Sequence, residues 1–276
     1  MKIFIVGLGL IGASYAEGLH QKGHKIFAYN RNEEHVKTAV KQGFVESDNS
    51  LKRLTSCDLV ILALYPEHNV EFVKNNLDLF KKGQVVTDVS GTKTKMMQEI
   101  EAMLPEGVSY TSHHPMAGKE TSGFLSRDHN MFKNANFLIV KGSRSIDKDE
   151  KLLTEIANSL RFGKITVMDA KTHDELIAFT SQLTHVLAVT LVHSDHLTLT
   201  KEATGDSYRD LTRIAKINES MWTELFLENK DALLNKISDF EIQLEKIKQL
   251  IKEGNVLELQ KYLKEAKERR MTFDLY

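Results

Sequence analysis

Two spacings of apolar residues divide the sequence. Up to residue 169, short β-branched runs that suit strands buried in a parallel sheet alternate with amphipathic stretches that suit helices. The predicted strands are 2–6, 25–29, 58–63, 84–88, 108–112, 137–140 and 164–168, and the predicted helices are 13–21, 32–42, 67–80, 92–104 and 147–160. This alternation indicates an α/β fold with a doubly wound, Rossmann-type domain.

From residue 170 onward the apolar residues keep helical steps of three and four almost throughout. Three long stretches carry this pattern, at 177–191, 233–251 and 256–270. They predict an all-helical second domain, so the expected domains are 1–169 and 170–276, with the boundary near Ala170. The apolar faces of these helices predict burial against a second copy, giving a homodimer through the helical domain.

A glycine pattern, Gly7-x-Gly9-x-x-Gly12, connects the first predicted strand to the first helix. The first glycine permits a tight turn, the second lets backbone approach a pyrophosphate, and the third lets helix and strand pack closely. Leu10 and Ile11 belong to this turn and precede the predicted helix, whose unpaired N-terminal amides bind an anion. One lysine before an apolar run also resembles a secretory signal, but such a signal does not need three glycines at this spacing.

The end of the second predicted strand bears on the choice of cofactor. Proteins that prefer NAD usually carry an acidic residue about 20 residues after the glycine pattern, where it binds the ribose 2′-hydroxyl. Here Asn30 and Arg31 occupy that place. An arginine can pair with a 2′-phosphate, so the sequence favours NADP over NAD. NAD stays open, because Asn30 can bind a ribose hydroxyl and Arg31 can be an ordinary surface residue.

Composition narrows the class of protein. Of the 276 residues 41% are hydrophobic and 27% charged, and the net charge of -1 gives no indication of a nucleic-acid or membrane surface. We expect no membrane span, because no apolar run approaches about 20 residues. The single cysteine, Cys57, fits a cytoplasmic protein. The spacing of His193 and His196 would place both on one face of a helix, but no third ligand is evident and we expect no metal.

Two small polar loops are expected at carboxyl ends of strands, where open α/β sheets bind their ligands. The loop at 88–93 contains Ser90 and Thr92, and the loop at 113–123 contains His114. The proline that follows His114 holds it in an extended conformation. We expect its titratable ring to point at the nicotinamide.

The chain resembles the prephenate/arogenate dehydrogenase family of tyrosine biosynthesis. The likeness rests on blocks in both halves of the chain, with similar order and spacing. They are GLGLIG at 7–12, HPMAG at 114–118 with Ser122-Gly123, HDELIAFTSQLTH at 173–185 and SYRDLTRIAKINESMW at 207–222. The resemblance implies NAD(P)-dependent oxidative decarboxylation of prephenate to 4-hydroxyphenylpyruvate.

The resemblance also implies roles for single residues. His114 matches the catalytic histidine that accepts the proton of the substrate's ring hydroxyl as hydride leaves the same carbon. Arg213 matches the arginine that binds a substrate carboxylate. His185 and Trp222 match residues that line the substrate site, and Glu120 falls near the entrance of the cleft.

The sequence departs from the family at three places. Relatives often have Gly-Ser in the first loop, where this chain has Ser90-Gly91, so Ser90 and Thr92 are both candidates for the role of that serine. Gln182 stands where relatives often have histidine, and Thr184 where they often have proline. Two alternatives stay open: a dehydrogenase that converts arogenate directly to tyrosine, and a non-catalytic dimer that senses NAD(P).

Overall fold

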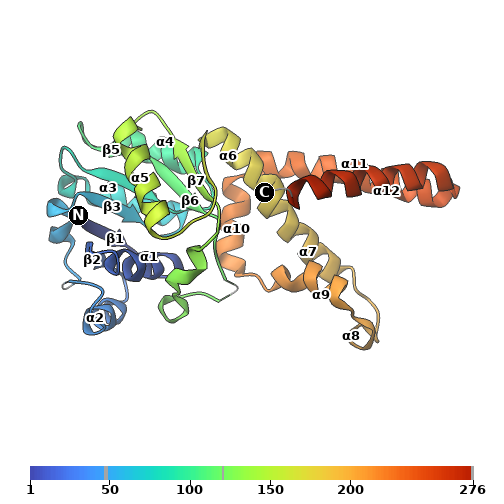
Figure 1. The fold of residues 1–276 in the computed structure, drawn as a ribbon, viewed down its shortest axis with the longest axis horizontal. Helices are drawn as coiled ribbons and strands as arrows, with labels where there is room; N and C mark the ends of the chain where they lie inside the picture. The colour runs from blue at the N-terminus through green and yellow to red at the C-terminus, as the bar shows by residue number, and fades with distance from the viewer. Residues whose placement is uncertain (47–48, 120, 275–276) are drawn as a thin grey trace. The chain divides into compact units, whose positions relative to one another are not determined.

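The first part of the chain folds around a five-stranded parallel sheet (Figure 1). The structure is a computed structural model, and it describes residues 1–46, 49–119 and 121–274. The strand order is β2-β1-β3-β4-β5, with β1 at Lys2–Val6, β2 at Lys25–Tyr29, β3 at Leu59–Leu62, β4 at Val85–Asp88 and β5 at Ser109–Tyr110. The chain reverses its direction of sheet growth after β2, which is the doubly wound topology expected from the sequence.

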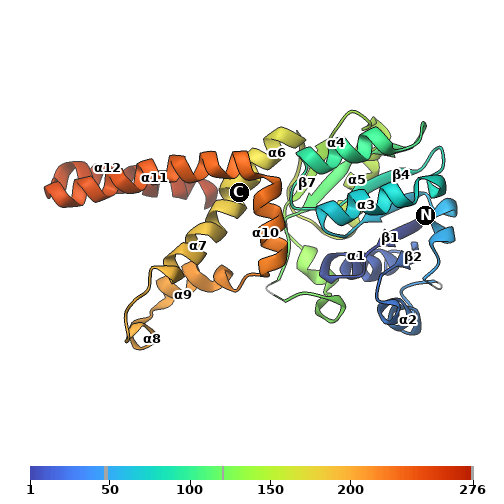
Figure 2. The same cartoon turned by 180° about the vertical axis from the view of Figure 1, so that it is seen from behind.

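Helices cover both faces of this sheet because the side chains of each strand alternate between two cores. Ile3 and Ile5 of β1 pack with α1 (Leu10–His20), α2 (Glu33–Lys41) and α5 (Asp147–Ser159). Phe4 and Val6 pack with α3 (Pro66–Asn75) and α4 (Thr94–Met103) on the other face. Figure 1 has α5 toward the viewer, and Figure 2 has α3 and α4 there, side by side.

The predicted strand 108–112 is in fact two strands in two sheets. After β5 the chain passes through Thr111 and enters β6 (Ser112–Pro115), which pairs antiparallel with β7 (Phe137–Lys141); β7 pairs parallel with β8 (Ile165–Asp169). His113 and His114 therefore lie in a strand, and the expectation that they belong to a loop was wrong. Strand pairing gives them the opposite side-chain orientations that a flexible loop would not fix.

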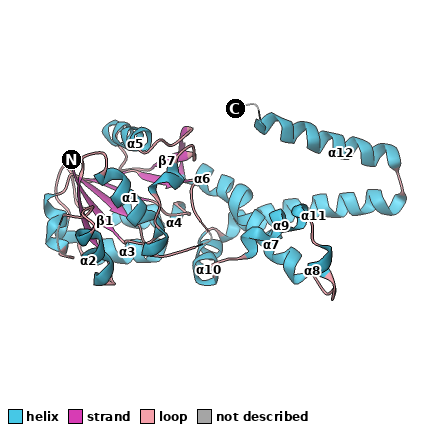
Figure 3. Ribbon diagram, turned by 60° about the horizontal axis from the view of Figure 1, so that its bottom comes forward, coloured by secondary structure: helices cyan, strands magenta, loops and turns pink. Residues whose placement is uncertain are grey.

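The helices that follow begin directly after β8. A single helical run comprises α6 (Ala170–Ile177), one turn of π-helix (Ala178–Gln182) and α7 (Leu183–His193). After it come α8 (Thr200–Ala203), α9 (Asp206–Thr212), a 3-10 turn at Arg213–Ala215 and α10 (Glu219–Glu228). Within the described residues no strand follows residue 169, in agreement with the predicted change of pattern, as Figure 3 shows.

By its contacts the chain forms two compact units, Met1–Asn229 and Lys230–Tyr276. The second unit is a helical hairpin of α11 (Lys230–Glu253) and α12 (Val256–Met271). Its turn is made by Gly254, with a φ of 64°, and by Asn255, whose side chain accepts a hydrogen bond from the backbone of α12.

One helical run, Ala170–His193, is long and apolar enough to cross a membrane by length and composition alone. It is the one such helix among the described residues, and the sequence expectation had found no apolar stretch of that length. Core helices of globular proteins meet the same criterion, so the helix is not by itself evidence of a membrane.

Candidate active site

The turn between β1 and α1 has the shape of a diphosphate cradle. Gly7 has a φ of +95°, and a Cβ there would lie 2.7 Å from the carbonyl oxygen of Ala63. A Cβ on Gly12 would lie 1.9 Å from the carbonyl oxygen of Gly7, whereas one on Gly9 would meet nothing within 4 Å. The open space beside Gly9 and the uncapped amides at Leu10, where α1 begins, fit the pyrophosphate of a dinucleotide.

Asn30 holds this turn in place. Its Oδ1 accepts a hydrogen bond from the backbone N–H of Leu8 at 2.9 Å, and its Nδ2 donates to the carbonyl oxygen of Asn32 at 2.9 Å. Asn49 braces the backbone of Asn30 by accepting from its N–H and donating to its carbonyl. Arg31 follows directly and is exposed. The structure thus places the expected cofactor residues around one turn, with an arginine at its rim.

A buried ion pair fixes the loop that follows β4. Asp88 and Lys93 are both fully buried, and their Oδ1 and Nζ atoms lie 2.8 Å apart. Tyr110 donates to the other carboxylate oxygen at 2.7 Å, and Lys93 also donates to the carbonyl oxygen of His113 at 2.9 Å. Burial alone would raise the pKa of Asp88, but the charge and hydrogen bond of Lys93 keep that pKa below its usual value. Burial lowers the pKa of Lys93, and the charge of Asp88 opposes that shift. The two ends of the loop are joined by this ion pair.

Within this loop the two candidate hydroxyls differ. Ser90 accepts a hydrogen bond on Oγ from Asn69 at 3.0 Å. The Oγ1 of Thr92 is buried and has no hydrogen-bond partner among the residues that the structure describes. Between them, a Cβ on Gly91 would lie 3.3 Å from Cδ2 of Leu225. The glycine lets α10 pack closely on the loop, which gives a physical reason for the Ser90-Gly91 order in this chain.

The two histidines of β6 face different surroundings. His113 is fully buried between Thr87, whose Oγ1 lies 2.7 Å from Nδ1, and Tyr15, whose hydroxyl lies 2.9 Å from Nε2. Burial, together with the charge of Lys93, lowers the pKa of His113 to about 3, so this ring stays neutral and serves packing. The neighbouring His114 is partly exposed.

His114 is a neutral imidazole. Burial of most of its ring, and then the nearby His173, Lys93 and His113, lower its pKa well below the usual value. Its Nδ1 lies 2.9 Å from Nε2 of His173 on α6. Its own Nε2 makes no hydrogen bond within the described residues. Such a ring can accept a proton at Nε2 at ordinary pH.

The helices contribute a second group of predicted residues. The rings of His185 and Trp222 stack with centroids 3.7 Å apart, and Trp222 packs on Phe226 at 5.4 Å. The Nδ1–H of His185 donates to the carbonyl oxygen of Ser181 at 2.9 Å. Burial, and then the charge of Arg213, lower the pKa of His185, so the guanidinium lies near this ring. His185, Trp222 and Arg213 are thus brought together as an aromatic platform with a cation.

Hydrogen bonds hold α10 against the nucleotide-binding part. Glu224 accepts from the backbone N–H of Glu67 at the start of α3 at 3.0 Å, and Glu228 pairs with Lys95 of α4 at 2.7 Å. Gln182 donates to the carbonyl oxygen of Leu225 at 2.7 Å. Gln182, which stands where relatives often have histidine, therefore fixes the helix that carries Trp222.

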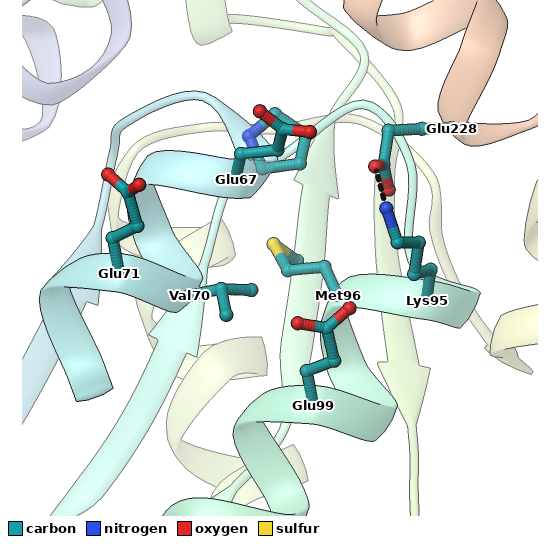
Figure 4. Close-up of a pocket in the computed structure, with 8 residues that line it drawn as sticks. Glu67, Val70, Glu71, Lys95, Met96, Glu99 and Glu228 are labelled. Atoms are coloured by element: carbon teal, nitrogen blue, oxygen red, sulfur yellow. Dashed lines mark hydrogen bonds and ion pairs between the residues drawn. The ribbon is translucent and has the colours of Figure 1, made fainter.

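A groove lies between the starts of α3 and α4, and it is not this site. Figure 4 shows it lined by four glutamates and Lys95, with the Glu228–Lys95 ion pair at one side. None of the predicted site residues lines it. Its negative charge does not suit an anionic ligand. Of the predicted site residues, Glu120 lies outside the described residues, and within the described chain no cluster of three or more histidine, cysteine or acidic residues is placed to hold a metal.

Comparison with known families covers both parts of the chain. The model "Prephenate dehydrogenase, nucleotide-binding domain" matches residues 15–166, and the model "Prephenate dehydrogenase, dimerization domain" matches residues 169–265. The chain belongs to the prephenate dehydrogenase family. The resemblance stated from the sequence blocks is confirmed, and the chain is an oxidoreductase with an NAD(P)-binding domain of the α/β Rossmann type followed by helices.

Three similar proteins align with 99% or more of the chain. Prephenate dehydrogenase of Lactococcus lactis is 32% identical over 100% of this chain and 78% of its own. A prephenate dehydrogenase structure from A. aeolicus, in complex with hydroxyphenyl propionate and NAD+, is 29% identical with a TM-score of 0.89, covering 99% of this chain and 98% of that one. Arogenate dehydrogenase of Synechocystis shares the fold, with 24% identity and a TM-score of 0.88 over 99% of this chain and 100% of its own.

Sequence reasoning missed two residues that the structure puts beside His114. His173 lies in contact with His114, and the next residue, Asp174, binds His173. Their signal in the sequence was an adjacent His-Asp pair close to the expected domain boundary. Spacing alone gave no reason to bring that pair to a strand 59 positions away.

Proposed function

We propose that this chain catalyses the NAD(P)-dependent oxidative decarboxylation of prephenate to 4-hydroxyphenylpyruvate. The observation that carries the proposal is the neutral imidazole of His114 at the edge of the sheet, with Nδ1 engaged by His173 and Nε2 left to accept a proton. Membership of the prephenate dehydrogenase family, and a relative named for a complex with NAD+, support this choice of reaction.

The chemistry that we propose balances around His114. The bound nicotinamide supplies the acceptor for the hydride. Nε2 of His114 takes the proton of the ring hydroxyl while hydride leaves the same carbon, so the C–O bond becomes a carbonyl. Loss of the ring carboxylate as carbon dioxide leaves its electron pair in the ring, which becomes aromatic. The phenolate oxygen then takes the proton back, and His114 ends the cycle neutral.

The remaining predicted residues receive binding roles in this proposal. Arg213 pairs with a substrate carboxylate, because a guanidinium offers two parallel donors to a carboxylate. The stacked rings of His185 and Trp222 line the ring of the substrate. Thr92 is the better candidate than Ser90 for the loop hydroxyl, since Asn69 already donates to Ser90.

For the cofactor we propose NADP over NAD, on the basis of Arg31. The exposed guanidinium follows Asn30, whose side-chain oxygen is already engaged by the glycine turn. Substituting Arg31→Ala should lower kcat/KM for NADP and leave that for NAD nearly unchanged. Equal loss with both cofactors would contradict this preference.

The substrate and the assembly complete the proposal. Arogenate differs from prephenate in its side chain, so a kcat/KM higher for arogenate than for prephenate would select the alternative activity. We propose a homodimer through an all-helical domain that begins near Ala170, supported by the dimerization-domain model and by the strongly exposed Leu197, Leu199 and Leu211. Light scattering that gives a monomer at micromolar concentration would contradict the dimer. The buried, unpaired Cys57 supports a cytoplasmic location.

A further inference from the structure

A chain of three polar side chains leads inward from His114. Nδ1 of His114 lies 2.9 Å from Nε2 of His173, and Nδ1 of His173 lies 2.8 Å from Oδ1 of Asp174. His173 is fully buried and Asp174 is 6% exposed. His114 lies in β6, and the other two residues lie in α6. These side-chain contacts therefore connect the sheet that contains β6 to α6.

The carboxylate at the end of this chain is held from both sides. Its Oδ1 accepts the backbone N–H of Lys93 at 3.0 Å, and its Oδ2 accepts that of Thr94 at 2.8 Å, at the start of α4. Burial by itself would raise the pKa of Asp174, but the hydrogen bonds from His173 and Thr94 hold it below its usual value. Asp174 is therefore an acceptor only, with a fixed orientation.

The hydrogen-bonding capacity of each ring then fixes its proton. A carboxylate can only accept, so the Nδ1 of His173 must carry a hydrogen and donate it to Asp174. Burial is the largest influence on His173 and lowers its pKa, so this ring is neutral and its Nε2 is an acceptor. The Nδ1 of His114 must then be the donor between the two rings, which leaves the lone pair of His114 on Nε2.

We propose that His173 and Asp174 are positioning residues that hold His114 in the Nδ1-protonated tautomer and so present Nε2 as the proton acceptor. This rests on the proposed function, in which His114 takes the hydroxyl proton. When His114 becomes an imidazolium, its Nδ1–H still donates to His173, and the negative charge of Asp174 stabilises the cation through that ring.

The other titratable groups that face His114 act in the opposite direction. Lys93 approaches from the loop before α4, His113 precedes it in β6, and His173 faces it from α6. Each of these disfavours a positive charge on His114. Asp174 is thus the group in this network whose charge favours the imidazolium, and its removal should shift the titration of His114 downward.

Two substitutions separate the parts of the network. Asp174→Asn removes the charge and the fixed acceptor while keeping the shape. It should lower kcat by about tenfold to a hundredfold with little change in KM, because alignment supplies part of the effect of a general base. The acid limb of the kcat profile should move to lower pH, a shift that a merely structural residue would not produce.

His173→Asn and His173→Gln test the contact with His114 directly. A glutamine places its oxygen near the position of Nε2 and can still accept from His114, whereas an asparagine does not reach. We expect the glutamine variant to retain about tenfold more kcat than the asparagine variant, the worth of one hydrogen bond to a charged group. Both variants keep the carboxylate of Asp174 at the start of α4. If His173 served only to support that contact, the two variants would be equally active. Equal activity would therefore overturn the proposal.

The decisive readout is the ring nitrogen spectrum of the whole protein labelled with 15N-histidine. The wild type should show a protonated Nδ1 and an unprotonated Nε2 for His114, and Asp174→Asn should change that pattern. Asp169→Asn is the matched control, because Asp169 caps the same helix by accepting from Thr172 at 2.9 Å and, among the described residues, makes no hydrogen bond with His173. It should leave both the spectrum and kcat unchanged.

The outcomes are distinct from those of the proposed function. A protonated Nε2 on His114 in an active wild-type enzyme would overturn the positioning role and leave the reaction intact. The expected tautomer in a protein that turns over neither prephenate nor arogenate would overturn the reaction and leave the positioning role intact.

Discussion

The part of the chain around β4 and β6 and the helices after residue 183 handle polar and apolar groups in opposite ways. Around the strands the polar side chains are buried and paired, as in Asp88 with Lys93 and His113 between Thr87 and Tyr15. In α9 and α10 no residue is fully buried, and large apolar side chains such as Leu211 are exposed. In the first region the polar groups are paired within the chain. The second region exposes apolar surface of the kind that binds a substrate or another chain.

This contrast predicts different roles for the two regions. Buried and paired groups keep fixed orientations, as the alignment of a base for proton transfer requires. Exposed cations and aromatic rings adapt to a bound dianion. Substitutions in the first region should therefore change kcat or stability, and substitutions in the second should change KM.

The largest expected effect comes from His114. Replacing His114→Asn removes the proton acceptor, and kcat should fall by on the order of 10² or more. His196→Asn, at an exposed histidine of the helical region, is the matched control and should have no effect. A kcat within a few-fold of the wild type would remove His114 from the mechanism.

The next effect concerns stability. Lys93→Met leaves Asp88 buried without its partner, and the free energy of unfolding at neutral pH should fall by about 3–5 kcal/mol. Because the pKa of Asp88 is lowered in the folded state, the contribution of the pair is present above the unfolded pKa of about 3.9 and is lost as the pH falls through the folded value. The difference between variant and wild type should narrow below about pH 4.

Urea unfolding at pH 7 and pH 3 measures that difference. Lys248→Met in α11 is the control, because Lys248 pairs with Glu245 at 2.8 Å while 70% and 65% of the two side chains are exposed. An exposed pair contributes less than about 1 kcal/mol. If both lysine variants lost equal stability, the distinction between the two regions would not hold.

A smaller effect is expected in the second region. Arg213→Ala should raise KM for prephenate about tenfold and change kcat little, because the guanidinium binds the substrate before and during the reaction alike. Steady-state kinetics with Arg209→Ala beside it provides the comparison, since Arg209 is exposed and pairs with Asp206. A near-normal KM for Arg213→Ala would reject its binding role.

The smallest effect is expected at the loop where the regions meet. Gly91→Ser restores the hydroxyl position common in relatives, but its Cβ would press on Leu225 at 3.3 Å. Leu225 has a flexible side chain, so we expect a change in kcat of no more than about threefold. Gly205→Ser, where a Cβ meets nothing within 4 Å, should be silent. A gain above tenfold at Gly91 would mean that the missing hydroxyl limits this enzyme.

The sequence predicted the fold because each strand and helix keeps the spacing of apolar residues that is typical of its type. Strands 2–6 and 25–29 appear at the predicted residues, and the glycine turn has the predicted geometry. The break at Thr111 was not predictable, since one apolar-to-polar run continues through two sheets. The packing of α6 and α10 on the nucleotide-binding part depends on backbone N–H groups that donate to Asp174 and Glu224, and such contacts leave no periodic signal.

For the candidate site, too, the sequence indicated some features and missed others. Motifs made His114 and Arg213 candidates, each in its own block of sequence. They gave no sign that Asn69 occupies the hydroxyl of Ser90, or that Gln182 fixes α10, because those contacts join residues 21 and 43 positions apart. Partners of a residue in space are set by the topology, and the sequence pattern alone does not contain them.

The central claim is tested most directly by adding prephenate to the purified protein with NAD and, separately, with NADP. We predict a rise in nicotinamide absorbance with release of one carbon dioxide for each reduced cofactor, faster with NADP. No reduction of either cofactor with prephenate would contradict the account.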